Sequence, residues 1–178
     1  MMLENLNKYN IILASKSPRR QELLKGIGLP FSVLTKDVDE SFSSEISVFD
    51  VAPFLSYKKA KAFEESELPG NYMVITADTV VVVGDAILGK PKDFEDACNM
   101  LRLMSGKKHF VVTGVTIHTK EKTKTFSAIS KVSFEVLNED EINYYVSMYK
   151  PFDKAGSYGI QEWIGYVGVN SVEGSYFN

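Results

Sequence analysis

The run Tyr72–Val83, with sequence YMVITADTVVVV, constrains the fold of this chain more than any other stretch. It is strongly apolar and rich in β-branched residues, which is typical of a central, buried β-strand. Asp78 and Thr79 interrupt it, and a carboxylate in a buried strand is costly unless a proton, a cation or strong hydrogen bonds compensate. A bulge or a strand end is the structural alternative. Because perturbed carboxylates cluster in active sites, we favour a functional role for Asp78.

A second landmark is the stretch Ile11–Arg20, with sequence IILASKSPRR. Its apolar beginning predicts a short buried strand, and Ser17 followed by Pro18 predicts an N-cap and the first helical residue. Arg19 and Arg20 then fall in the first helical turn, where the helix dipole disfavours cations. Two guanidinium groups beside free backbone N–H groups suit a bound anion, phosphate above all. A pair of solvated surface arginines is the alternative.

The remaining pattern predicts alternating helices and strands. Leu23, Leu24 and Ile27 are expected to form the buried face of the helix that begins at Pro18, with Gly26 or Gly28 closing its last turn. Further helices are predicted over residues 50–63, 93–104 and 138–148, and Phe94 is expected on the buried apolar stripe of the second. Strands are predicted over residues 31–34, 86–88, 110–119, 125–137 and 166–172.

Composition excludes several classes of protein. A net charge of −3 over 178 residues argues against a general nucleic-acid binder. Cys98 is the only cysteine, which rules out an internal disulfide and a thiolate zinc cluster. With His109 and His118 as the only histidines, any metal would be a hard cation on oxygen ligands. No apolar run approaches membrane-spanning length, so we expect a cytoplasmic protein.

Several charged residues are candidates for binding. Lys59 shares the inward stripe of its predicted helix, where it either snorkels or reaches into a cleft. Glu40 ends an acidic cluster that is either a solvated turn or a cation site. Gly84–Lys90 matches the first part of a P-loop, but Pro91 replaces the magnesium-binding hydroxyl, so we reject a P-loop. Lys90 itself can still bind phosphate.

The loop Asp153–Gln161 is the third landmark. Its glycines permit tight backbone turns, and its polar residues are too varied for a simple turn. It is typical of a binding loop, with an ordered structural loop as the alternative. Short motifs therefore follow one another along the chain: Ala14–Arg20 (ASKSPRR), Ala77–Val80 (ADTV), Gly89–Pro91 (GKP), Leu103–Gly106 (LMSG), Asp153–Gln161 (DKAGSYGIQ) and Glu173–Tyr176 (EGSY).

With these motifs in this order, the chain resembles the Maf family of nucleoside triphosphate pyrophosphatases. The resemblance implies an α/β fold like that of inosine triphosphate pyrophosphatase, with a mixed, twisted sheet flanked by helices and two lobes around a cleft. It implies hydrolysis of the α–β phosphoanhydride of a nucleoside triphosphate with Mg²⁺ or Mn²⁺, and a homodimer. The family continues beyond Tyr176 into a further segment, so residues 1–178 are expected to be one Maf-like domain without it.

The resemblance also implies roles for individual residues. Asp78 is the expected base or activator of water, and Asp78 with Glu40 is the expected metal site. The triphosphate is expected to lie on Ser15, Arg20, Lys59 and Lys90. Lysine, arginine and metal charges would neutralise the phosphates while a carboxylate orients the attacking water.

The resemblance further points to the subfamily that acts on dTTP and UTP. Its three specificity positions correspond to Arg19, Thr79 and Gln161, and all three match. One departure is Glu162-Trp163 after Gln161, where the family commonly has glycine. A non-catalytic nucleotide-binding regulator of cell division is the alternative from another class, and a phosphatase that releases orthophosphate is a third reading.

Overall fold

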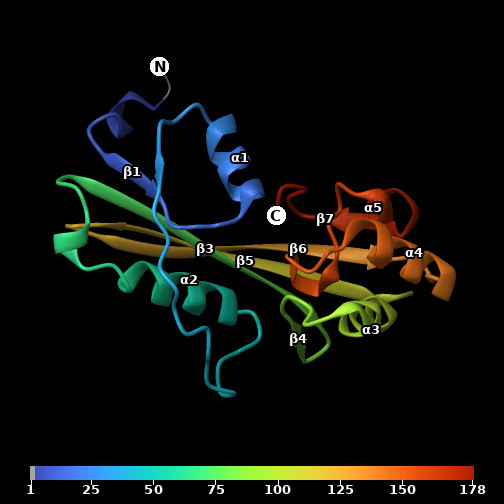
Figure 1. The fold of residues 1–178 in the computed structure, drawn as a ribbon. Helices are drawn as coiled ribbons and strands as arrows, with labels where there is room; N and C mark the ends of the chain where they lie inside the picture. Colours follow the sequence, from blue (N-terminus) through green and yellow to red (C-terminus); the bar gives the residue numbers. More distant parts are fainter. Residues whose placement is uncertain (1–2) are drawn as a thin grey trace. The chain divides into compact units, whose positions relative to one another are not determined.

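The computed structural model describes residues 3–178, which form two compact units. Among the described residues, unit 1 contains residues 3–78 and 114–127, and unit 2 contains residues 79–113 and 128–178. The strands form one seven-stranded sheet of order β2-β1-β3-β5-β6-β7, with β4 paired to β3. Parallel and antiparallel pairs both occur in it. The predicted α/β fold with a mixed sheet flanked by helices is therefore confirmed (Figure 1).

Three long strands pass through both units, and their bounds lie within three residues of the predicted ones. Strand β3 covers Tyr72–Val83, as predicted, and burial extends along both of its faces. Strands β5, Lys108–Thr119, and β6, Thr123–Phe134, are joined by a short turn in which Thr119 N donates to Lys122 O at 2.9 Å. Burial on both faces explains why β3 is a continuous apolar run rather than an alternating one.

Unit 1 is built on parallel pairing of β1, Asn10–Leu13, with β3 and with β2, Ser32–Val33. Helix α1, Pro18–Gly26, and helix α2, Val51–Lys61, lie on opposite sides of these strands (Figure 1). The side chains of Ile12, Tyr72 and Val74 on these strands form a buried cluster with Phe63. Two 3₁₀ turns, η1 and η2, cover Glu4–Leu6 and Glu65–Glu67.

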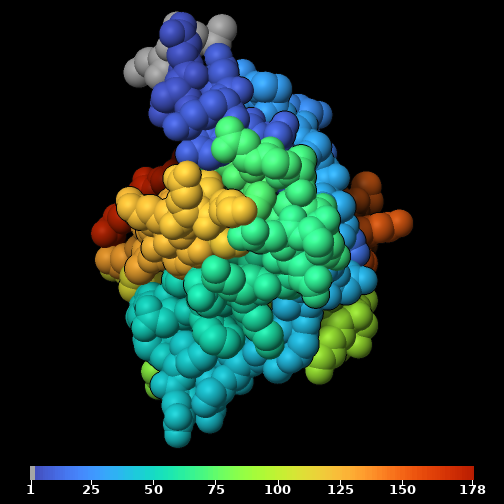
Figure 2. Space-filling model, turned by 90° about the vertical axis from the view of Figure 1, so that its left-hand side faces the viewer, coloured from blue at the N-terminus to red at the C-terminus, as the bar shows by residue number. Residues whose placement is uncertain are grey.

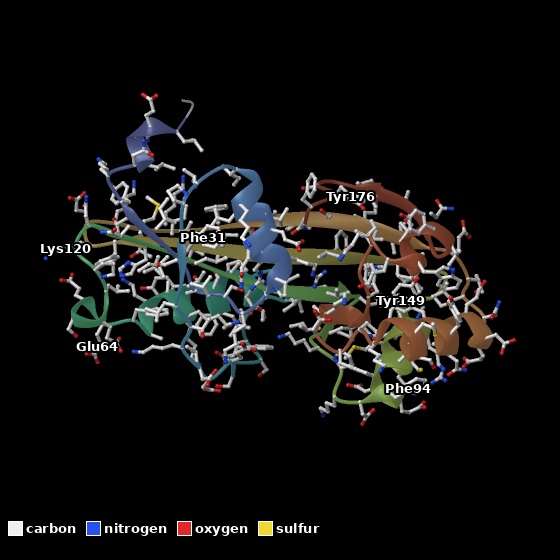
Figure 3. All side chains as sticks on the ribbon, turned by 45° about the horizontal axis from the view of Figure 1, so that its top comes forward. Phe31, Glu64, Phe94, Lys120, Tyr149 and Tyr176 are labelled. Carbon is white, nitrogen blue, oxygen red and sulfur yellow. The ribbon has the colours of Figure 1, made fainter. Side chains whose placement is uncertain are left out.

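Two surface features of unit 1 can be followed in the figures. The cyan segment between β2 and α2 projects at the bottom of the space-filling view (Figure 2). Lys120, in the turn between β5 and β6, lies at the same end of the unit as Glu64, and Lys120 Nζ is 3.4 Å from Glu65 Oε2 (Figure 3). Such an exposed pair contributes little to stability.

The prediction for the face of α1 was wrong. Only Leu24 is buried, whereas Leu23 and Ile27 are 43% and 58% exposed. The helix therefore packs through a narrow contact rather than a full apolar stripe. Gly28, at φ +79°, follows the helix end as predicted, because glycine adopts this left-handed conformation without steric cost.

Unit 2 has a larger core between the strands and three helices. Strand β4, Ala86–Leu88, is the strand predicted there and forms a hairpin with β3, and β7, Val169–Glu173, pairs antiparallel with β6. Helix α3, Phe94–Met104, packs against α4, Glu139–Tyr149. Both helices begin at the predicted caps: Asp93 Oδ1 accepts from Asp96 N, and Asn138 forms a capping box with Glu141.

Two expectations in unit 2 need correction. The predicted strand over residues 166–172 is in part a short helix, α5, Trp163–Val167, with β7 following it. A Cβ on Gly165 would lie only 1.7 Å from Ile160 O, so this turn requires glycine. Phe94, expected on the buried face of α3, is 40% exposed and lies at the outer side of the helix (Figure 3).

Candidate active site

The carboxylate of Asp78 is buried in β3 and paired with Lys59. Asp78 is only 8% exposed, and its Oδ1 accepts a hydrogen bond from Lys59 Nζ of α2. Burial raises the pKa of Asp78 above its ordinary value, and the nearby Lys59 opposes that rise. Lys59 therefore reaches inward to a carboxylate rather than snorkelling to water. This is an ion pair placed on two rigid elements, a strand and a helix.

Glu40 contacts the same ammonium group. Lys59 Nζ is 2.8 Å from Glu40 Oε1, so the carboxylates of Glu40 and Asp78 converge on one point in unit 1. Two carboxylates that share one cation make a site of the kind that binds Mg²⁺ together with substrate phosphates and water. No group of three or more His, Cys, Asp or Glu side chains that could hold a metal occurs among residues 3–178. Two carboxylates would leave the remaining coordination positions of a hard cation to water and substrate oxygens.

Arg20 lies beside this pair. Its Nη1 donates to the carbonyl oxygen of Ala77 at 2.7 Å, which fixes the guanidinium next to the residue that precedes Asp78. Burial lowers the pKa of Arg20, and the Asp78 carboxylate opposes that effect. Arginine is effectively always protonated in proteins, so the Arg20 side chain is still a cation at neutral pH.

The start of α1 has no side-chain cap, unlike the starts of α3 and α4. Ser17 is the N-cap and Pro18 the first helical residue, as predicted, but the Ser17 side chain makes no capping hydrogen bond. Instead, the buried Ser15 hydroxyl accepts from Ser17 N at 3.2 Å. Arg19 is exposed on the first turn. A helix start without a side-chain cap and with two arginines is a suitable place for an anion.

In unit 2, Lys90 and Gln161 lie on loops that are attached to each other. Lys90 is exposed and follows Gly89, whose carbonyl oxygen accepts from Gly156 N at 3.0 Å. Gly156 has φ +66°, and a Cβ there would lie 2.8 Å from a methyl group of Val81 on β3. Glycine is therefore required where the 153–162 loop crosses β3.

Thr79 directly follows Asp78 on β3 and is half-buried. Its Oγ1 shares a hydrogen bond of 2.8 Å with Thr113 Oγ1 on β5. Gln161 is exposed, and its carboxamide lies against Gly159, since a Cβ there would lie 3.1 Å from Gln161 Nε2. The assignment of Arg19, Thr79 and Gln161 to base recognition stays a prediction.

Sequence reasoning missed two buried groups in unit 2. His109 on β5 shares a hydrogen bond of 2.7 Å with the hydroxyl of Tyr158, and burial lowers the pKa of His109 to about 4. Lys154, only 8% exposed, pairs with Glu162. Its place directly before a loop with two glycines, Gly156 and Gly159, was the available signal for the second group. His109 carried none, because its strand pattern is that of an ordinary core residue.

A shallow cavity elsewhere in unit 2 is separate from these residues. It has a volume of about 340 Å³ and is lined by Asn138, Asp140, Glu141, Tyr144 and Trp163. None of the predicted site residues lines it. No helix among residues 3–178 is both long enough and apolar enough to cross a membrane.

Comparison with known proteins identifies the family of this chain. A family model described as Maf-like protein matches residues 10–178. A protein of Bacteroides thetaiotaomicron named dTTP/UTP pyrophosphatase is 51% identical over 99% of this chain and 92% of its own length. A protein of Flavobacterium johnsoniae with the same name is 46% identical over the whole chain and 91% of its own length.

A solved structure supports the fold. The Staphylococcus aureus Ham1 protein is 18% identical and aligns with a TM-score of 0.50 over 70% of this chain and 71% of its own. At this level of identity the similarity concerns the fold alone.

Proposed function

The chain belongs to the family of Maf-like proteins, and we propose that it hydrolyses dTTP and UTP to the nucleoside monophosphate and pyrophosphate. The names of relatives at 46–51% identity over nearly the full length support this substrate class. The observation that carries the chemistry is the buried Asp78 carboxylate, which is paired with Lys59 and flanked by Arg20. A binding protein alone would gain nothing from a buried carboxylate that faces a polyanion.

The proposed mechanism assigns each charged group a task. Asp78 accepts a proton from water as the water oxygen attacks the α–β phosphoanhydride, and pyrophosphate leaves with the electron pair of the broken P–O bond. Its raised pKa makes Asp78 a stronger base than an ordinary carboxylate. Arg20 and Lys59, with Ser15 and the start of α1, would hold phosphate oxygens. Lys90 on its exposed loop would supply a further cation.

A divalent cation has a suitable place in this scheme. Asp78 and Glu40 would hold it, because their carboxylates already converge on the Lys59 ammonium group. When bound, Mg²⁺ or Mn²⁺ neutralises phosphate charge and lowers the pKa of bound water. Glu40→Gln should therefore raise the metal concentration that gives half-maximal activity, whereas Asp37→Asn, which removes an exposed acidic neighbour, should not.

Selectivity for the base gives the direct test of the substrate class. Uracil and thymine present two carbonyl acceptors flanking an N–H donor, whereas cytosine reverses the pattern at two positions. A carboxamide such as Gln161 can satisfy the first pattern, and a mismatch leaves buried polar groups unpaired. We expect kcat/KM for UTP and dTTP to exceed that for CTP and dCTP by about 100-fold or more. Similar values for UTP and CTP would contradict the assignment of Gln161.

Two accompanying expectations concern location and assembly. The substrates are made and used in the cytoplasm, so we place the proposed activity there. The homodimer that the family resemblance implies stays a prediction. Light scattering of the purified protein at several concentrations would give its molar mass and test that prediction.

A further inference from the structure

The 153–162 loop of unit 2 contains a buried ion pair. Lys154 Nζ lies 2.8 Å from Asp153 Oδ1 and 3.0 Å from Glu162 Oε1. The Lys154 and Glu162 side chains are only 10% and 19% exposed, whereas that of Asp153 is 62% exposed. Lysine is rarely buried unless it is paired, so Glu162 is the partner that matters for its burial.

The same glutamate attaches the loop to helix α4. The second carboxylate oxygen of Glu162 accepts a hydrogen bond from the hydroxyl of Tyr145, whose side chain is fully buried. The Tyr145 oxygen in turn accepts from Gly159 N at 3.1 Å. Glu162 N also donates to Gly159 O at 3.0 Å, which closes the turn between them. The hydroxyl of Tyr145 thus forms hydrogen bonds with both ends of this turn, Gly159 and Glu162.

Gln161 lies inside that turn, beside the ion pair. A Cβ added to Gly159 would lie 3.1 Å from Gln161 Nε2, 3.3 Å from Gln161 Oε1 and 3.2 Å from Lys154 Cε. The Gln161 carboxamide and the aliphatic part of Lys154 therefore both rest over the bare backbone of Gly159. Any movement of Lys154 or Glu162 changes the surface on which this amide rests.

We propose that Lys154 and Glu162 are positioning residues that hold the Gln161 carboxamide in one orientation and thereby set the discrimination between uracil and cytosine. This inference rests on the proposed function, in which Gln161 reads the base. A carboxamide carries a donor on one side and an acceptor on the other. If it rotates freely by half a turn, it matches either base, so selectivity requires that its orientation be fixed.

Lys154 is assigned this role, and no phosphate-binding role, because of its partners. Its ammonium group already contacts two carboxylates, which leaves it no net charge to offer to a polyanion. Glu162 is an anion and would repel phosphate. Neither residue needs to touch the nucleotide for the proposed effect.

The test compares the ratio of kcat/KM for UTP to that for CTP in Glu162→Gln, Lys154→Met and the double variant. The ratio is informative because any loss of folded enzyme lowers both values equally and cancels. We expect each single variant to lower the ratio roughly tenfold or more, as misplacement of a substrate-contacting group does. The double variant should lose no more than either single variant, because residues of one network are not additive.

Two further variants serve as control and support. Lys131→Met removes an ion pair with Glu173, 3.0 Å long, on β6 and β7, and should leave the ratio unchanged. Tyr145→Phe keeps the buried ring while removing the hydroxyl that holds Glu162, and should lower the ratio. Glu162→Gln retains shape and an acceptor for Tyr145, so it is the variant most suited to preserving the fold.

A second measurement avoids turnover. Trp163 is the only tryptophan in the chain and follows Glu162 directly, so its fluorescence reports on this loop. Titration with the non-hydrolysable α,β-methylene analogues of UTP and CTP gives two dissociation constants for each variant. Their ratio should change in Glu162→Gln as the kinetic ratio does.

The outcomes separate this inference from the function on which it rests. If Gln161→Ala lowers the UTP to CTP ratio but Glu162→Gln and Lys154→Met leave it unchanged, the positioning role is overturned and the proposed function stands. If Gln161→Ala itself leaves the ratio unchanged, Gln161 does not read the base and both assignments are overturned. If Lys154→Met lowers UTP and CTP turnover equally while Glu162→Gln has no effect, Lys154 binds phosphate and the inference is wrong.

Discussion

Lys59 on α2 donates a hydrogen bond to Asp78 on β3, and the two side chains are only 20% and 12% exposed. The ion pair withdraws the proposed catalytic carboxylate from water while keeping a cation beside it. Burial affects the pKa of Asp78 more than the cation does, because this pKa lies above its ordinary value. This opposition between burial and pairing determines how the site responds to mutation and to pH.

Replacing Asp78 by asparagine should abolish turnover and increase stability. The amide cannot accept the proton of water, so kcat should fall by about 10²–10⁴. A carboxyl group with a raised folded pKa contributes stability below its unfolded pKa and loses it as the pH rises through the folded value. Ionised Asp78 therefore costs stability at pH 7, and Asp78→Asn should raise the melting temperature. A variant that melts lower and keeps most of its kcat would refute the assigned role.

The activity of the wild-type protein should fall on acidification at a pH above the ordinary pKa of an aspartate, about 3.8. The reason is that burial raises the pKa of Asp78, and only its ionised form can accept a proton. The acidic limb of kcat/KM against pH, measured with UTP at a metal concentration well below half-saturation, gives this value for the free enzyme. A profile flat down to pH 4 would show that Asp78 is not the group that titrates.

Lys59→Ala should lower kcat/KM for UTP by roughly 10- to 100-fold, because it removes a charged contact worth about 1.5–3 kcal/mol. It also leaves Asp78 buried without this cation, so the acidic limb should move to higher pH. The neighbouring Lys58 is the matched control, since it pairs with the exposed Asp39 at 3.1 Å. Equal kinetics for Lys58→Ala and Lys59→Ala would mean that Lys59 does not act in the site.

His109 should make the folded protein less stable in acid. Burial lowers its pKa to about 4, whereas unfolded histidine titrates near 6.5. Its contribution is fully present above pH 6.5 and is lost as the pH falls toward 4, by about 3 kcal/mol in total. The free energy of unfolding of His109→Gln, measured by urea titration, should therefore fall less between pH 7 and pH 4.5 than that of the wild type. The same fall in both proteins would show that His109 does not cause the loss of stability in acid.

The framework of the fold was predictable because local signals there agree with packing. The apolar run of β3 and the caps at Asp93 and Asn138 each correspond to an element with the expected start. The wrong predictions concern residues whose burial differs from the one that the apolar pattern of the sequence indicates. Ile27 is apolar but remains exposed, because α1 is buried through Leu24 alone.

The site was predictable only in part, for a related reason. Asp78 carries a strong signal in sequence, since a carboxylate in a β-branched run is costly. The partners of Asp78 come from residues far along the chain, and no local pattern reveals that Lys59 reaches both Asp78 and Glu40. The ion pair of Lys154 and Glu162 was likewise invisible, because it depends on how the loop closes against Tyr145.

The product of UTP hydrolysis tests the central claim most directly. ³¹P NMR of a reaction with UTP and Mg²⁺ distinguishes the products, with Asp78→Asn assayed in parallel at equal protein concentration. The account predicts UMP and pyrophosphate in equal amounts from the wild-type protein and no more than trace turnover from the variant. Release of UDP and orthophosphate, or equal rates for the two proteins, would contradict it.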